Sequence, residues 1–330
     1  MWKKIIGYSL LAVLCVAGAG LAYLYFRSPA VAAPAPIKVE GTPARLARGE
    51  YIFNLADCDG CHSPENEKLY DHPPVDGMRA AGKVFPDPSV PGKLTVPNIT
   101  PDKETGIGAW TDGEKIRAIR EGIGRDGHAI FPLMPYPHFR YMSDDDVQSL
   151  VAYLNSLPPV RNTLPPTKLN FPIPLLIKGE PSPATGVVKT PDRSNKVLYG
   201  EYLVTLGSCE TCHTEAENGH IDVSKRYGGG RRFEADGHVV VSANITPDKQ
   251  SGIGDWSLDR FQQRFYKHKE HSGKPHNDAD PEKFTIMPWG QLSQLPPEDL
   301  EAIYVYLKSQ RPVENKVESH PEPVSGKLGS

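Results

Sequence analysis

Net charge is almost absent from this 330-residue chain: 37 Lys and Arg stand against 40 Asp and Glu, which leaves a formal net charge of −3. This balance predicts neither nucleic-acid binding nor a strong attraction of the whole protein to a charged membrane surface. Cysteine and methionine are scarce, with five of each, so chemistry that depends on sulfur has few candidate residues. Proline and glycine number 33 and 30, which predicts long ordered loops and few long helices.

Four of the five cysteines stand in two copies of one pattern. C-x-x-C-H occurs at residues 58–62 and 209–213, while Cys15 lies in a hydrophobic N-terminal segment. This pattern is the attachment sequence of c-type haem: two thiols one helical turn apart add to the two vinyl groups of one porphyrin edge, and the following histidine binds the iron as its proximal ligand. We therefore predict two covalently bound haem c groups. The attachment residues are Cys58, Cys61, Cys209 and Cys212, and the proximal ligands are His62 and His213.

Two alternatives use the same cysteines. The two C-x-x-C pairs could together bind one structural zinc ion, or each could act as a redox dithiol. The zinc site leaves the histidine after each second cysteine unexplained, and it requires two pairs that are 151 residues apart (209 − 58) to meet. We favour haem over both.

The sequence repeats beyond the cysteines, which points to two modules of one design. The repeated segments are G-E-Y at 49–51 and 200–202, N-I-T-P-D-K at 98–103 and 244–249, G-I-G-x-W at 106–110 and 252–256, and M-P at 134–135 and 287–288. The offset between copies drifts from 146 (244 − 98) to 153 (287 − 134), as small insertions and deletions would cause. We predict a tandem duplication.

One long hydrophobic run lies near the N-terminus. Residues 5–26 carry no charge and follow Lys3 and Lys4. The run can span a bilayer, and the two lysines place its start on the cytoplasmic side. The alternative is a signal peptide cleaved after Ala32. We favour a retained anchor in the inner membrane with the haem domains in the periplasm; cleavage would leave a soluble periplasmic protein.

We expect a mostly α protein with two haem domains in tandem, a proline-rich linker and an N-terminal transmembrane helix. The expected boundaries are 1–26 for the anchor or signal, 27–43 for a tether, 44–160 for the first haem domain, 161–193 for the linker, 194–313 for the second haem domain and 314–330 for a flexible tail. Because the stretch 169–177 is too apolar for a freely solvated linker, we expect it to lie extended against one or both domains.

Three helices are predicted in the first domain, around a loop-rich middle at 63–110. One runs from Ala44 to Leu55, the second begins at Thr111, and the third is capped by Ser143, with Asp146 three residues on. The third has a counterpart at the end of the second domain. The buried positions expected in these two closing helices are Val147, Leu150, Val151 and Leu154, and Leu300, Ile303, Tyr304 and Leu307.

The second axial ligand of each iron is predicted from the scarcity of methionine. Methionine in that position keeps the coordination complete and favours the reduced iron. The second domain contains only Met287, and its counterpart in the repeat is Met134, each followed by proline. Met78 and Met142 have no such partner. We predict Met134 and Met287 as axial ligands; methionine as core filler is the alternative.

Several other residues allow two interpretations. His128 and His138 flank Met134 and are alternative ligands. His268, His271 and His276 stand with Asp278 and Asp280 in a polar insertion, which could bind a metal but which we expect to be a solvated loop. Trp110 and Trp256 could contact the haems or belong to the core.

The order of these features resembles class I cytochrome c in tandem: an N-terminal helix, C-x-x-C-H, a long loop, and M-P before a final helix. N-I-T-P-D-K, G-I-G-x-W and the stretch from Met134 to Val147 are similar, more narrowly, to the cytochrome c subunits of membrane-bound alcohol- or gluconate-type dehydrogenases. The resemblance covers about 44–313. The best-known members of that family have three haem motifs, whereas this chain has two.

The resemblance implies a non-catalytic electron carrier. A dehydrogenase subunit would be the donor, and quinone, an oxidase or another cytochrome the acceptor. Two alternatives are a dihaem peroxidase-like enzyme, which needs one iron open to peroxide, and a dihaem subunit of a terminal oxidase. The Met-Pro sequence in both domains predicts a second ligand on each iron, which argues against an iron open to peroxide and therefore against the peroxidase.

Overall fold

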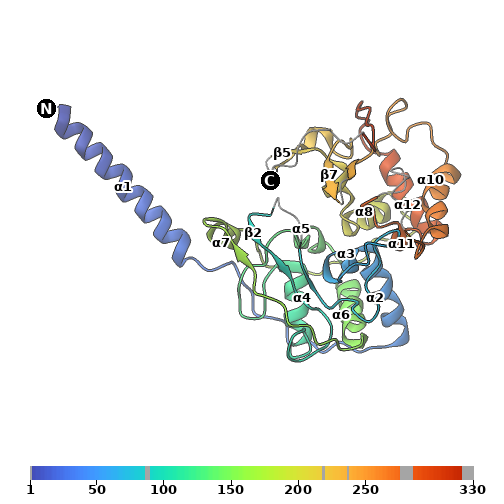
Figure 1. The fold of residues 1–330 in the computed structure, drawn as a ribbon, viewed down its shortest axis with the longest axis horizontal. Helices are drawn as coiled ribbons and strands as arrows, with labels where there is room; N and C mark the ends of the chain where they lie inside the picture. Colours follow the sequence, from blue (N-terminus) through green and yellow to red (C-terminus); the bar gives the residue numbers. More distant parts are fainter. Residues whose placement is uncertain (1, 86–89, 218–219, 236–237, 276–284, 322–330) are drawn as a thin grey trace.

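The computed structural model describes residues 2–85, 90–217, 220–235, 238–275 and 285–321. Helices are the main regular structure in this part of the chain (Figure 1). The α-helices are α1 (Trp2–Phe26), α2 (Pro43–Leu55), α3 (Cys58–His62), α4 (Asp112–Glu121), α5 (Tyr136–Phe139), α6 (Asp144–Ser156), α7 (Ile173–Leu176), α8 (Lys196–Leu206), α9 (Cys209–His213), α10 (Leu258–Tyr266), α11 (Trp289–Leu292) and α12 (Pro297–Lys308). Short 3-10 helices cover Ile177–Gly179, Val223–Lys225 and Lys267–Glu270.

Strands are short and form two-stranded antiparallel pairs, β1 with β3, β2 with β4, β5 with β6 and β7 with β8. Their bounds are β1 (Lys83–Val84), β2 (Gly92–Lys93), β3 (Thr95–Val96), β4 (Lys168–Leu169), β5 (Ala216–Glu217), β6 (His220–Ile221), β7 (Arg232–Ala235) and β8 (His238–Val241). In the predicted loop-rich middle, the described residues 63–85 and 90–110 are thus mostly irregular chain.

The folded body has two halves, the first containing α2 to α6 and the second α8 to α12. The first half is built on the crossing of α2 and α6. Thr42 caps α2 and Pro43 occupies its first turn, where a missing N–H costs nothing. The two helices approach closely at Gly49, where a Cβ would collide with the carbonyl oxygen of Ser149. Ile52 and Phe53 are fully buried beside this crossing.

The second half repeats this arrangement with α8 and α12. A Cβ on Gly200 would collide with the carbonyl oxygen of Ala302, as one on Gly49 would with Ser149. Leu203 and Leu300 are fully buried at this second crossing. Figure 1 shows the two halves side by side, with α1 extending away from both.

The helices predicted from the sequence are confirmed, but one position expected to be buried in α12, Tyr304, is only half-buried. Thr111 and Glu114 form a complete capping box at the start of α4, and Ser143 caps α6 by accepting from the Asp146 N–H. The four expected positions of α6 are all buried. In α12, Tyr306 is buried, whereas Tyr304 is half-buried and donates its hydroxyl to the Trp256 carbonyl at 2.8 Å.

The segments outside the two halves differ from expectation. The expected tether lies against the first half: Val39 is buried, and its N–H donates to Asp112 at 2.8 Å. In the expected linker, Leu169 ends strand β4, which pairs with β2 of the first half as an extended segment would. Residues 173–177 instead form α7 and the start of a 3-10 turn, and Phe171 is 72% exposed. Residues 314–321 are bonded to the second half through Ser319, whose carbonyl accepts from Val241; the rest of the tail lies outside the described residues.

Candidate haem sites

Each C-x-x-C-H motif forms a one-turn helix, α3 or α9. The residue before each helix has a left-handed backbone, with φ 48° at Asp57 and 51° at Ser208. Asp57 then accepts a hydrogen bond from the N–H of Gly60, at 3.3 Å. The helical turn brings both cysteines of a motif to one side, as two bonds to one porphyrin edge require.

Both motif histidines are held in the orientation that an iron ligand needs. Nδ1 of His62 lies 2.8 Å from the Pro97 carbonyl oxygen, and Nδ1 of His213 lies 2.7 Å from that of Ala243. A carbonyl oxygen can only accept, so Nδ1 carries the proton and Nε2 keeps the lone pair that binds a metal. Burial lowers the pKa of His62 to about 4 and lowers that of His213, so both rings are neutral.

The two N-I-T-P-D-K segments hold those carbonyl groups in place, a role that the repeat alone did not reveal. Asn98 follows Pro97, accepts from the Thr100 N–H at 2.9 Å and donates to the Val160 carbonyl at 2.7 Å. Asn244 follows Ala243 and makes the same contacts. It accepts from the Thr246 N–H at 2.9 Å and donates to the Val313 carbonyl at 2.7 Å. Each asparagine thus ties the loop behind the motif histidine to the chain that follows the last helix of its half.

The geometry argues against the zinc interpretation. Among the described residues, no three His, Cys, Asp or Glu side chains stand close enough together to bind one metal ion. Desolvation and the carboxylate of Asp57 raise the pKa of the Cys61 thiol to about 11, and desolvation raises that of Cys209 to about 12. Without a bound group, both thiols are therefore protonated and uncharged at neutral pH.

The two motifs lie near each other although they are far apart in the sequence. Cys212 lies close enough to Cys61 to contribute to its raised pKa, after desolvation, Asp57 and Glu65. Thr211 Oγ1, inside the second motif, lies 3.2 Å from Nε2 of His138 in the first half. The attachment sites therefore meet where the two halves join.

Met134 and Met287 occupy equivalent places. Each is half-buried against the hydrophobic core and is followed by proline and a one-turn helix, α5 or α11. The carbonyl of Met134 accepts from the Tyr136 N–H at 2.8 Å, and that of Met287 from the Trp289 N–H at 2.7 Å. Met142, by contrast, is fully buried in the core. The structure thus separates Met142 as core filler from the two methionines in the loops.

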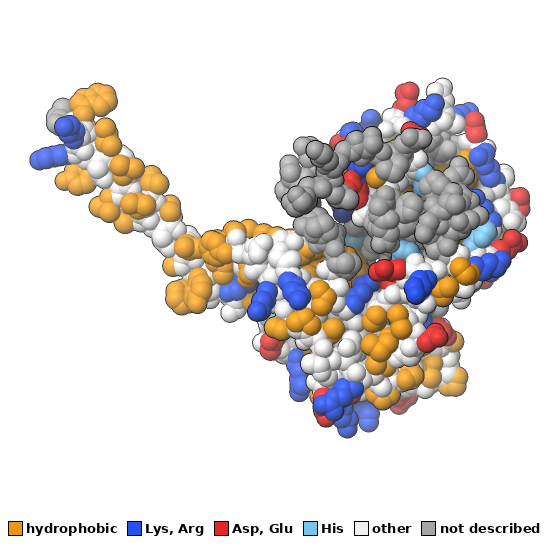
Figure 2. All heavy atoms as spheres, viewed as in Figure 1, with side chains coloured by type: hydrophobic (Ala, Val, Ile, Leu, Met, Phe, Trp, Pro, Cys, Tyr) orange, Lys and Arg blue, Asp and Glu red, His pale blue; other side chains and the backbone are white. Residues whose placement is uncertain are grey.

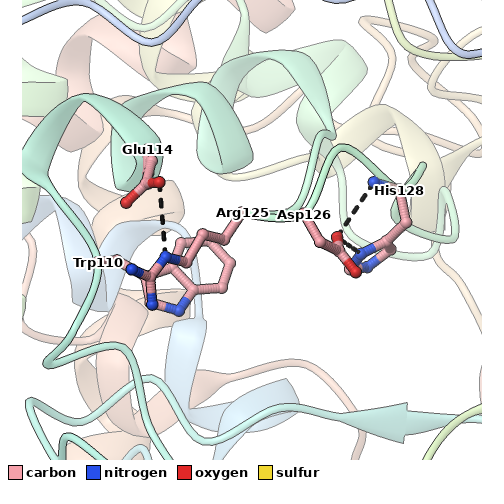
Figure 3. Close-up of a pocket in the computed structure, with 5 residues that line it drawn as sticks. All are labelled: Trp110, Glu114, Arg125, Asp126 and His128. Atoms are coloured by element: carbon pink, nitrogen blue, oxygen red, sulfur yellow. Dashed lines mark hydrogen bonds and ion pairs between the residues drawn. The ribbon is translucent and has the colours of Figure 1, made fainter.

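The histidines that flank Met134 have other surroundings. His128 is exposed and contacts Asp126, at the edge of an open pocket that Trp110 also lines (Figure 3). His138 lies against Thr211. Trp110 and Trp256 are both half-buried and pack against the core.

The histidine-rich insertion was expected to be solvated, and this expectation is wrong for His268. Its ring is buried, stacks on Trp289 with 4.1 Å between ring centroids, and lies 2.6 Å from the hydroxyl of Tyr70 in the first half. Packing between the halves therefore covers it. His276, Asp278 and Asp280 lie outside the described residues.

Comparison with known proteins gives a consistent picture. Residues 46–158 match the family model described as cytochrome c. The chain is 32% identical to the cytochrome c subunit of a quinone-dependent alcohol dehydrogenase from Gluconobacter oxydans, over 81% of this chain and 55% of that protein. It is 30% identical to the cytochrome c subunit of gluconate 2-dehydrogenase from Pantoea cypripedii, over 82% of this chain and 60% of that protein.

The chain thus spans little more than half of those two relatives. It matches a dihaem c-type cytochrome from Cereibacter sphaeroides almost end to end, with 30% identity over 90% of this chain and 95% of that protein. A cytochrome c domain implies covalently bound haem c, which agrees with a buried C-x-x-C-H histidine whose Nε2 is free for iron. On the evidence of the motif geometry and of these relatives together, the chain belongs to the cytochrome c family.

Proposed function

We propose that this protein is a dihaem c-type cytochrome that relays single electrons between a dehydrogenase and the respiratory chain. The observation that carries the proposal is the repeated anchoring of the proximal histidine, His62 on Pro97 and His213 on Ala243, beside two motifs that meet at one interface. Electron transfer as such is the property of the cytochrome c domain. The second haem and the relay are our proposal.

In this proposal the chain supplies attachment, axial ligands and a dry surrounding, while bound haem supplies the one-electron chemistry. Cys58 and Cys61 would attach the first haem and Cys209 and Cys212 the second. His62 with Met134, and His213 with Met287, would supply the ligands to the two irons. A haem held by two protein ligands in both oxidation states would supply one-electron chemistry with little rearrangement.

The contacts between the halves support a fixed relation between the two haems. The hydroxyl of Tyr51 donates to Asp299 at 2.6 Å, and that of its repeat counterpart Tyr202 donates to Asp146, the counterpart of Asp299, also at 2.6 Å. Each half thus contributes one tyrosine that donates and one aspartate that accepts, which is the reciprocal arrangement of the two-fold interface in a homodimer. Both aspartates are buried, Asp146 with 3% and Asp299 with 1% of its surface exposed, so these bonds are shielded from water.

The relatives and the N-terminal helix suggest the setting. Relatives named as subunits of alcohol, gluconate and fructose dehydrogenases make a dehydrogenase the donor in our proposal, with quinone, an oxidase or another cytochrome as acceptor. Helix α1 is long and apolar enough to cross a membrane. We propose that it anchors the protein in the inner membrane, with both haems in the periplasm.

A haem count and a peroxide experiment test this function. The pyridine haemochrome of the purified protein should correspond to two haems, and Cys212→Ala together with Cys209→Ala should reduce it to one. The reduced protein should be oxidised only slowly when it is mixed with peroxide in a stopped-flow instrument. Rapid peroxide turnover at one haem would instead support the peroxidase-like alternative.

A further inference from the structure

The end of α1 is bonded to α7 through Arg27 and Leu176, which are 149 residues apart in the chain (176 − 27). The guanidinium of Arg27, the first residue after α1, donates to the carbonyl of Leu176 at 2.9 Å. In return, the ammonium of Lys178 donates to the carbonyl of Tyr25, in the last turn of α1, at 2.8 Å. These two bonds place α7 at the level where the helix leaves the apolar region.

Apolar side chains around α7 are exposed. Phe171 is 72% exposed and Leu176 is 47% exposed, and Pro172 and Pro174 also face solvent. Figure 2 shows hydrophobic side chains continuing from the helix on to the adjoining part of the folded body, where Figure 1 places α7 and β2. Exposed apolar groups that adjoin each other in this way mark interaction surfaces more often than chance.

The backbone around α7 is held in place, which makes this apolar surface a defined feature. Strand β4, which leads into α7, pairs with β2, with Gly92 opposite Leu169 and Lys93 opposite Lys168. Leu175 is buried beneath the turn. The two paired lysines are exposed next to the apolar side chains.

We propose that the segment 171–178 lies in the headgroup region of the membrane that α1 spans, as a second membrane contact. The inference rests on the proposed anchoring by α1. Continuity with α1 identifies lipid as the occupant, because a segment bonded to the last turn of a membrane helix stays at the membrane surface.

The residues fit that location. Tyr23 and Tyr25 at the end of α1 are of the kind that favours the interface. The ammonium groups of Lys93 and Lys168 can reach lipid phosphates while their stems remain in apolar surroundings. Two contacts, one spanning and one interfacial, would hold the folded body in one orientation on the membrane. A single helix with a free tether would leave it able to turn.

A fluorescent label at residue 171 tests the proposal in the full-length holoprotein. Cys15→Ala removes the one cysteine outside the haem motifs, and Phe171→Cys is then labelled with an environment-sensitive dye in phosphatidylcholine vesicles that contain phosphatidylglycerol. Val187→Cys is the matched control, since Val187 is 76% exposed and has no bond to α1 among the described contacts. The label at 171 should be blue-shifted and quenched by brominated lipid, while the label at 187 should behave as in water.

Equal exposure of both labels to water would overturn the inference. Flotation of the same vesicles separates this failure from failure of the anchor, because a protein that does not float with lipid lacks the anchor itself. A second measurement uses Phe171→Ser with Leu176→Ser in oriented bilayers. The haem absorption should be unchanged and the linear dichroism of the haem bands should fall. Unchanged dichroism would also overturn the proposal.

Discussion

At the scale of single residues, the sites depend on side chains whose partners are backbone groups. His62 and His213 each use Nδ1 on a carbonyl oxygen, which leaves Nε2 for iron. Asn98 and Asn244 hold the loops that carry those carbonyls. These partners cannot be identified from side-chain type, because the accepting groups are the backbone carbonyls of Pro97 and Ala243.

The two methionines that we propose as axial ligands give the first residue-scale prediction. Met134→Ala should remove about half of the far-red charge-transfer band of the oxidised protein and lower the potential of one haem, because the thioether favours reduced iron. Met287→Ala should do the same to the other haem, and each change should open its iron to carbon monoxide. Spectra and redox titration measure both effects.

Two controls accompany these variants. Met78→Ala should leave the spectrum unchanged. Met142→Leu is preferred to Met142→Ala, because Met142 is fully buried and its truncation would destabilise the core by about 2–5 kcal/mol. Loss of half the band in Met142→Leu, with no effect of Met134→Ala, would contradict the repeat-based assignment in the first half.

Asp71 gives a prediction about pH. Neither of its carboxylate oxygens, both shielded from solvent, has a hydrogen-bond partner among the described residues, and burial raises its pKa to about 7. Between about pH 4 and pH 7 the folded protein therefore holds a proton that the unfolded chain has lost, so the free energy of unfolding falls as the pH rises through this range. Asp71→Asn should raise the melting temperature above pH 7 by on the order of a few degrees and have little effect at pH 4. An identical pH dependence in the variant and the parent protein would count against this burial.

At the scale of elements, the two helix crossings are the parts that must fit most closely. Gly49→Ala should place a methyl group against the Ser149 carbonyl and destabilise the first half by about 1–3 kcal/mol, the usual cost of overpacking. Gly200→Ala should act likewise on the second half, against Ala302. Denaturant unfolding followed at the haem bands measures both.

Gly41→Ala is the matched control for these substitutions. The nearest atom to a Cβ at Gly41 is 3.8 Å away, in Leu46, so the added methyl group meets no obstacle. Its midpoint should equal that of the parent protein. Equal midpoints for Gly49→Ala and Gly41→Ala would contradict the close crossing of α2 and α6.

At the scale of the whole molecule, the reciprocal tyrosine–aspartate bonds join the two halves. Burial, together with the charge of Asp299, raises the pKa of Tyr51, so its hydroxyl stays protonated and can donate. Tyr51→Phe with Tyr202→Phe removes both donors and leaves two buried carboxylates with one partner fewer, at about 1–3 kcal/mol each. The halves should loosen, and electron transfer between the haems, followed after pulsed reduction, should slow while both spectra remain unchanged.

Tyr304→Phe is the control for this pair of substitutions, since the Tyr304 hydroxyl bonds to Trp256 inside the second half. It should leave the inter-haem rate unaltered. An unchanged rate in the double variant would show that other contacts, such as Tyr70 with His268, suffice to fix the halves.

The sequence by itself determined the features that are local in the chain. C-x-x-C-H and the capping residues Thr111 and Ser143 act within a few positions, so spacing alone predicted the single helical turn between the motif thiols and the starts of α4 and α6. The repeat likewise pointed to equivalent places for Met134 and Met287. Local hydrogen bonds and helical periodicity need no knowledge of the rest of the fold.

Only the tertiary structure decided which distant residues meet. Tyr51 and Asp299 are 248 positions apart, and neither residue type indicates an interface on its own. His268 appeared to belong to a polar surface loop, yet Tyr70 and Trp289 cover it. Residues 169–177 were expected to pack on the body because they are apolar; Leu169 and Leu175 do so, whereas α7 also contacts the end of α1 and Phe171 stays exposed. Apolar side chains determine that a segment avoids water, whereas the surface that it contacts depends on where the fold places its ends.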